Sequence, residues 1–193
     1  MLTLSKPPPG EARIPVVVTD PNWPPRSAEL LARVDRLLGA GQSQEAVDAI
    51  GDAYLRCPWT ANALAVCHLR LGNTARAVRL LRYIATEHAS FELRADVPMV
   101  FKTNLATALL VGGNADEFLN TLDKLGGEDH PSARQLRATA ARWKKSLSAW
   151  QRFWWNIGGV APRRPRLDGP LGDLRDRPVG GRVCPLPPQG DGK

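Results

Sequence analysis

The sequence predicts an all-α protein, in which three helix-turn-helix repeats form an α-solenoid that a C-terminal helix caps and two extended arms flank. Three gapless segments, residues 30–59, 61–90 and 102–131, align on a glycine and share one pattern of apolar positions. Of the 17 prolines, seven fall in residues 1–26 and seven in residues 159–193. Because proline breaks helix interiors, this distribution indicates a helical middle between two proline-rich arms.

The size of the chain, 193 residues and 21.1 kDa, fits one folded unit with two arms. We expect a Pro-rich arm at residues 1–26, repeats at about 27–58, 59–90 and 98–131, a capping helix at 132–157 and a Pro/Gly/Arg-rich tail at 158–193. The helical domain therefore covers residues 27–157.

Composition favours a cytoplasmic protein. The chain is 43% hydrophobic and 23% charged, as globular domains are, and it contains no apolar run of about 18 residues that could span a bilayer. Three early prolines interrupt any secretion signal. The three cysteines are odd in number and lack metal-binding spacing, which indicates reduced thiols.

Each repeat is predicted to be a helix pair with its glycine at the turn. The three turn glycines are Gly41, Gly72 and Gly113. The positions seven and four before each glycine share one face of the first helix, and those five, nine and twelve after it share one face of the second. These positions are mostly apolar or small. The glycine is expected to end the first helix in the left-handed conformation. Polar residues after it, such as Asn73 and Asn114, are expected to cap the second helix.

Within the second repeat, residues 64–84 resemble the tetratricopeptide repeat (TPR) family, whose unit is a helix pair of about 34 residues. The matching residues are Leu64, Ala65, Gly72, Ala77 and Leu81, with Gly41, Ala46 and Pro58 in the first repeat and Leu105, Ala106 and Gly113 in the third. The glycine spacings of 31 and 41 residues depart from that period, and Phe118 fills a usually small position. The resemblance implies a right-handed TPR-like solenoid, with the extra residues in a loop at 88–99.

The resemblance also implies a non-enzymatic scaffold or adaptor for protein–protein interaction, which binds an extended or helical peptide in a concave groove. The expected groove residues are Leu31, Asp35, Leu38, Trp59, Asn62, Val66, Leu69, Thr103, Thr107 and Leu110. Trp59 is the best anchor, because an aromatic side chain supplies a large contact area, although packing between the first two helix pairs explains it equally well. Family members that grip a terminal carboxylate use Lys, Asn and Arg side chains, of which only Asn62 has a counterpart here.

The identity of the protein or peptide partner is open, and either arm is a candidate for docking within the molecule. The C-terminal arm carries Leu167, Leu171 and Leu174 among prolines that favour an extended chain. Residues 12–25 of the N-terminal arm are very apolar for a free tail. For each arm, a disordered linker is the competing interpretation.

No catalytic, cofactor or metal site is expected. His68 falls inside a repeat helix and is interpreted as a core histidine, because no nucleophile or carboxylate stands at a meaningful spacing from it. Cys57 and Cys67 are interpreted as buried structural cysteines. The sequence also lacks a glycine-rich phosphate loop.

The predicted capping helix is amphipathic and basic. Its apolar positions, spaced by four and three, are Leu136, Ala140, Trp143, Leu147, Trp150, Trp154 and Ile157. Such a helix would cover the face that the last helix pair leaves exposed. Trp155 lies off this stripe, so its exposure or burial distinguishes the two interpretations of the helix.

The alternative is a binder of anionic surfaces, either an acidic membrane or nucleic acid. The net charge of the chain is +7, of which residues 131–193 contribute +9. Cations and aromatic side chains on one helix suit both kinds of partner. The candidate cations are Arg142, Lys144, Lys145, Arg152, Arg163, Arg164 and Arg166.

Overall fold

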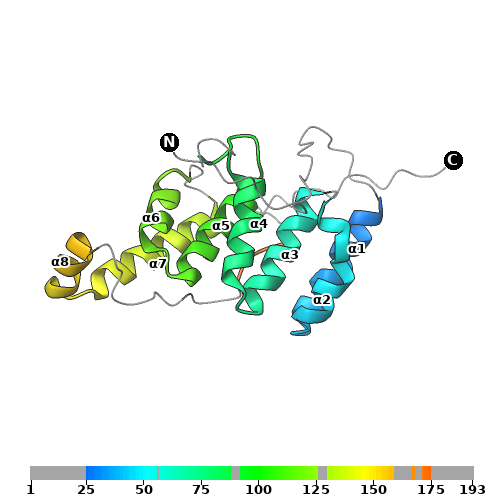
Figure 1. Ribbon diagram of the computed structural model, residues 1–193, viewed down its shortest axis with the longest axis horizontal. Helices are drawn as coiled ribbons and strands as arrows, with labels where there is room; N and C mark the ends of the chain where they lie inside the picture. Colours follow the sequence, from blue (N-terminus) through cyan, green and yellow to red (C-terminus); the bar gives the residue numbers. More distant parts are fainter. Residues whose placement is uncertain are drawn as a thin grey trace, which may run out of the picture.

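The computed structural model describes residues 25–55, 57–87, 92–125, 130–158, 167 and 171–174, which form a helical array (Figure 1). The α-helices are α1 (Pro25–Gly39), α2 (Ser43–Ile50), α3 (Pro58–Arg70), α4 (Thr74–Ala85), α5 (Met99–Gly112), α6 (Ala115–Asp123), α7 (Pro131–Ser146) and α8 (Ala149–Gly158), with the 3-10 helix η1 (Gly51–Leu55) after α2. The only β-type pairing within these ranges is an isolated bridge between Thr86 and Leu93. The predicted all-α class is confirmed.

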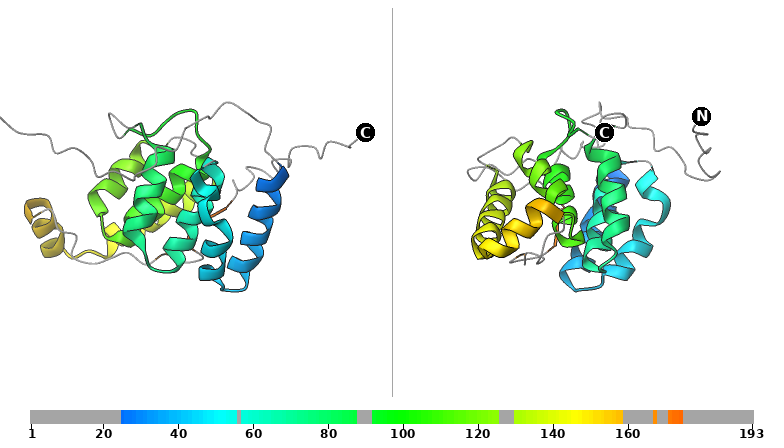
Figure 2. Two further views of the ribbon diagram at one scale, coloured as in Figure 1. Left: turned by 45° about the vertical axis from the view of Figure 1, so that its right-hand side comes forward. Right: turned by 60° about the vertical axis from the view of Figure 1, so that its left-hand side comes forward.

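The helices succeed one another along the long axis of the molecule, with α1 and α2 near one end and α8 at the other (Figures 1 and 2). From α1 to α7, each helix packs against the next in the chain. The odd-numbered helices also contact one another, α1 with α3, α3 with α5, and α5 with α7. They therefore share one continuous layer, which we call the odd-helix layer.

The three turn glycines end α1, α3 and α5 in the same way. Gly41, Gly72 and Gly113 are left-handed, with φ of 77°, 78° and 83°. After each glycine, the next N–H donates to the carbonyl five residues back, from Gln42 to Leu37, Asn73 to His68 and Asn114 to Leu109, at 2.8–2.9 Å. This 6→1 bond, with a 5→2 bond from the glycine itself, is the Schellman motif. The predicted glycine turns are thus confirmed.

Side-chain capping after these glycines was predicted wrongly. The side chains of Gln42, Asn73 and Asn114 make no capping hydrogen bond. Their backbone groups hydrogen-bond to both helices instead. Each N–H donates to a carbonyl of the preceding helix, and each carbonyl accepts the first hydrogen bond of the next helix. The backbone geometry of the Schellman turn is therefore sufficient to join the two helices.

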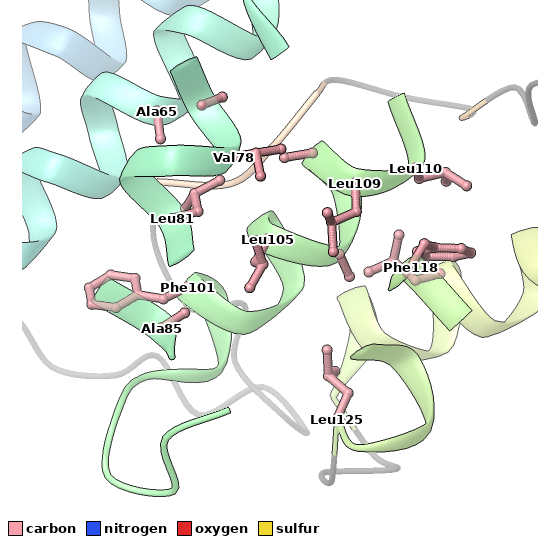
Figure 3. Close-up of a cluster of buried hydrophobic side chains, with 14 of the residues drawn as sticks. Ala65, Val78, Leu81, Ala85, Phe101, Leu105, Leu109, Leu110, Phe118 and Leu125 are labelled. Atoms are coloured by element: carbon pink, nitrogen blue, oxygen red, sulfur yellow. The ribbon is translucent and has the colours of Figure 1, made fainter. Parts of the chain in front are cut away.

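The predicted stripes form the core. Of the fifteen stripe positions, only Leu37 and Ala53 are half-buried and the rest are buried. In Figure 3, Leu105 and Leu109 of α5 lie between Leu81 of α4 and Phe118 of α6. A second cluster joins α1, α2 and α3 around Val34, Ile50 and Leu64, among others. Because apolar burial contributes about 25 cal/mol per Å², these two clusters supply most of the stabilisation of the array.

The C-terminal helix was predicted as one rod, and this was wrong: α7 ends at Ser146 and α8 begins at Ala149. Leu147 is extended and buried. Ser148 and Gln151 form a capping box, in which the Gln151 N–H donates to Ser148 Oγ (3.2 Å) and the Ser148 N–H donates to Gln151 Oε1 (2.9 Å). This pair starts a new helix and redirects the chain.

The redirection divides the predicted cap between two helices. Leu136 and Ala140 of α7 are buried in the main core cluster, and Trp143 is buried near Ala115. In α8, however, Trp150 is 66% exposed and Ile157 is 64% exposed. Trp150 had been expected in the core, but the apolar face of α7 covers α5 and α6 without it.

His68 gives the stability of the fold a pH dependence. Its ring is buried in α3, and within the described part of the chain neither ring nitrogen has a hydrogen-bond partner. Burial, with a smaller contribution from the positive charge of Arg76, lowers the pKa of His68 below 6.5. The unfolded chain therefore binds the proton more tightly, and stability falls as the pH drops below about 6.5.

We expect the melting temperature of the wild type to decrease between pH 7.5 and pH 5, and a His68→Leu variant to lose part of that decrease. Thermal melts of both proteins in matched buffers measure the effect. Parallel pH profiles for the two proteins would contradict it.

Candidate functional site

A short segment from the C-terminal arm, residues 171–174, lies against the odd-helix layer, and its sequence is Leu-Gly-Asp-Leu. It contacts Asn62 of α3, Asn104 of α5 and Ser132 of α7. The segment is orange in Figure 2, where it passes close to the helices. We call it the docked segment.

Two buried amides hold the backbone of Asp173. Asn104 Oδ1 accepts from the Asp173 N–H (2.9 Å), and Asn104 Nδ2 donates to the Asp173 carbonyl (2.7 Å). Asn62 Nδ2 donates to the same carbonyl at 3.3 Å, and Asn62 Oδ1 accepts from Asn104 Nδ2 at 2.8 Å. A side-chain amide carries both a donor and an acceptor, so it pairs with a peptide backbone as a neighbouring strand would. We call Asn62 and Asn104 the asparagine pair.

The burial of this pair makes the contact energetically important. Asn62 is 0% exposed and Asn104 is 1% exposed, on helices that are otherwise largely apolar. A buried polar group without a partner costs about 1–3 kcal/mol. The backbone of Asp173 therefore satisfies groups that the helices alone leave without enough partners.

The carboxylate of Asp173 has a partner of its own. Ser132 Oγ donates to Asp173 Oδ2 at 3.0 Å. Ser132 lies in the first turn of α7, where the helix dipole favours a negative charge. Different helices therefore bind the two parts of Asp173: α7 binds its carboxylate, and α3 and α5 bind its backbone.

Gly172 adopts a conformation that other residues avoid. It is buried with φ of 81°. An added Cβ would lie 3.0 Å from Val66 Cγ2 and 3.4 Å from Asn104 Oδ1. Both the backbone and the available space therefore favour glycine at this position.

The leucines of the docked segment contact two different parts of the core. Leu171 packs against the cluster that extends from α3 to α7, as does Leu167 just before it. Leu174 packs against the cluster formed by α1, α2 and α3. The segment thus spans the boundary between the two clusters.

The predicted groove residues differ in burial, and only some of them contact the docked segment. Asn62 and Val66 contact the docked segment, Leu31 is half-buried and Asp35 is exposed. The remaining five aliphatic and threonine positions, Leu38, Leu69, Thr103, Thr107 and Leu110, are buried within the helical array. The two threonine hydroxyls donate to carbonyls of α5 itself.

Trp59 packs between the second and third helix pairs. It is half-buried and meets Phe101 of α5 edge to face, with ring centroids 5.0 Å apart. Asn104, in contrast, was missed by the sequence analysis. The signal available was an asparagine inside the apolar helix α5, because a buried amide requires partners.

Three of the basic candidates lie on α7. Arg142, Lys144 and Lys145 are exposed on α7, and Arg142 donates to Thr139 Oγ1. The side chain of Arg152, as well as Arg163, Arg164 and Arg166, lies outside the part that the structure describes.

The aromatic side chains of α8 divide between burial and exposure. Trp155 is half-buried, packs on Trp143 (5.0 Å) and donates from Nε1 to Asp116 Oδ1 (2.9 Å). Trp150 and Phe153 stack on each other at 6.1 Å and are 66% and 52% exposed. Trp155 therefore ties α8 to α6, while the opposite apolar face is open to solvent.

Two other reactive side chains of the described residues are a buried thiol and a paired guanidinium. Burial raises the pKa of the Cys67 thiol to about 12, so it remains protonated at neutral pH. A hollow of about 190 Å³ lies between α4, α5 and α6, but its guanidinium, Arg82, is paired with Glu117. Across the described ranges, no three His, Cys, Asp or Glu side chains are grouped to hold a metal, and no helix is long and apolar enough to cross a membrane.

Comparison with known proteins returned no match to any protein family, curated protein or solved structure.

Proposed function

We propose that the protein is a non-enzymatic interaction module, a TPR-like scaffold or adaptor, which binds an extended polypeptide on its odd-helix layer. The observation that carries this proposal is the asparagine pair, because it holds the backbone of Asp173 through both its N–H and its carbonyl. Recognition of a backbone unit by a buried amide is suited to an extended chain, whose N–H and C=O groups are not engaged in a helix.

The arrangement of the helices supports a right-handed solenoid of the TPR type. Three consecutive helix pairs share the same Schellman turn, and their first helices, α1, α3 and α5, make up the odd-helix layer. In the TPR family, this layer faces the ligand. The free cysteines suit a reducing compartment such as the cytoplasm.

The test is binding in trans. A labelled peptide with the sequence of residues 167–176 is titrated into the full chain carrying Leu171→Ser and Leu174→Ser, which weaken its own docked segment. We expect saturable binding. Adding Asn104→Ala should reduce the affinity about tenfold, because two hydrogen bonds to the peptide backbone are lost.

The matched control is Asn73→Ala, which removes an exposed asparagine of the second turn and should leave the affinity unchanged. Fluorescence anisotropy measures binding, and circular dichroism shows whether each variant keeps its helices. Absence of binding by a chain that retains its native helical content would contradict the proposed function.

A second function is favoured by the exposed face of α8. Trp150, Phe153 and Ile157 stand three and four residues apart, so they share one face, and all three are exposed. Lys144 and Lys145 are exposed nearby in sequence, and residues 131–160 contain no acidic residue. An exposed apolar face on a basic stretch of the chain suits the surface of an acidic membrane.

Flotation with vesicles tests this second function. The full chain should bind vesicles that contain phosphatidylserine, bind neutral vesicles less, and dissociate as salt is added. Trp150→Ser with Phe153→Ser should abolish the binding, whereas Leu71→Ser, at an exposed leucine elsewhere, should not. Binding to single-stranded nucleic acid without binding to vesicles would contradict a membrane role.

A further inference from the structure

We infer that the odd-helix layer is selective for one kind of short, non-helical segment, in which glycine and aspartate stand between two large apolar residues. The ligand is then a partner protein that displays such a Leu-Gly-Asp-Leu-like segment and displaces the chain's own residues 171–174. This inference rests on the proposed peptide-binding function and specifies the sequence of the peptide that the layer binds.

Selection for glycine has two independent causes at one position. The left-handed backbone of Gly172 is unfavourable for any L-residue with a side chain. A Cβ there would also press on Val66 Cγ2 at 3.0 Å. Val66 is 0% exposed in the interior of α3, so it has little room to move away.

Selection for aspartate comes from the length of its side chain. The asparagine pair fixes the backbone of Asp173, and from that position the carboxylate reaches Ser132 Oγ at 3.0 Å. Alanine would lose this bond, and glutamate would carry its carboxylate one methylene farther. The N-terminal turn of α7 adds a preference for negative charge.

The two leucines of the docked segment supply apolar contact area. Leu171 packs against the α3–α7 cluster and Leu174 against the α1–α3 cluster, so the chain runs from the later helices toward the earlier ones. A segment bound in the opposite direction would present its N–H and C=O groups to the asparagine pair in the wrong order. The asparagine pair therefore fixes the polarity, because it binds one N–H and one carbonyl in a set order, and the two leucines add apolar contact area.

The chain's own docked segment occupies the binding surface, so a partner segment must compete with it. A segment tethered to the same chain competes at a high effective concentration. A partner segment must therefore bind more tightly than the tethered one or arrive in several copies. We expect the wild-type chain to bind the peptide of residues 167–176 more weakly than the chain with Leu171→Ser and Leu174→Ser.

The test uses that serine-substituted full chain and five peptides based on residues 167–176. They are the parent, L-alanine at position 172, D-alanine at position 172, alanine at position 173, and a scrambled peptide of the same composition. The L-alanine peptide should bind about tenfold more weakly, because an L-residue is disfavoured at positive φ. The D-alanine peptide should bind within about threefold of the parent, because D-residues favour positive φ.

The peptide with alanine at position 173 should bind about three- to tenfold more weakly than the parent, because the Ser132 hydroxyl loses a charged partner. Equal affinities for the parent, L-alanine and position-173 peptides would overturn the selectivity while leaving general peptide binding intact. A scrambled peptide that binds as the parent does would overturn it as well. Failure of every peptide, the parent included, instead contradicts the proposed function.

A measurement on the wild-type chain covers the case in which the serine variant does not fold. Hydrogen exchange of the Asp173 amide reports docking, since that N–H donates to Asn104. Excess parent peptide should accelerate this exchange, and the L-alanine peptide should not. Exchange that no peptide accelerates would mean that the segment is a permanent part of the fold, and would overturn the inference.

Discussion

Replacing Phe118 by alanine is expected to lower the free energy of unfolding by about 3–5 kcal/mol. Phe118 is 0% exposed and belongs to the core cluster shared by α3 to α7. Ala46 and Ala77 occupy the equivalent position in the first two repeats. In the third repeat the ring fills space that a methyl group would leave empty.

Urea denaturation of the wild type and the Phe118→Ala variant measures this difference. Leu71→Ala is the control, because Leu71 is 37% exposed and its truncation should change stability by no more than about 0.5 kcal/mol. If Phe118→Ala costs less than about 1 kcal/mol, the site collapses around the smaller side chain, and the third helix pair tolerates the alanine that the first two pairs have.

Leu136→Ala should destabilise the protein by about 2–5 kcal/mol, whereas Trp150→Ala should change stability by less than about 0.5 kcal/mol. Both residues belong to the amphipathic stripe that the sequence predicts. Leu136 is 3% exposed against the core, but Trp150, beyond the break at Ser148, is 66% exposed. The contrast follows because only the first contributes to the core.

Chemical denaturation of the two variants at one pH tests the division of the cap between α7 and α8. A large loss of stability in Trp150→Ala would mean that α8 packs on the array in solution. A small loss in Leu136→Ala would mean that α7 does not cover the third helix pair. Either result contradicts the packing described above.

The repeats and their turns follow from the sequence because they depend on local rules. Gly41, Gly72 and Gly113 each supply the left-handed residue that a Schellman turn needs, and the stripes follow from helix periodicity. The same locality explains one error. Apolar spacings of three and four residues continue through Leu147, so the Ser148–Gln151 capping box was not recognised, although both residues are visible in the sequence.

The contacts of the docked segment depend on tertiary structure. The hydrogen bonds of Asp173 to Asn62 and Asn104 join residues 111 and 69 positions apart, and the bond between the two asparagines spans 42 positions. Helix periodicity specifies which residues face inward, but not which polar groups from distant helices meet. The sequence alone therefore determined the helix pairs and Leu171 and Leu174 as apolar residues suited to docking. Only the packing of α3, α5 and α7 decided that Asn62, Asn104 and Ser132 converge on Asp173, because a buried polar group finds its partner wherever the assembled helices place one.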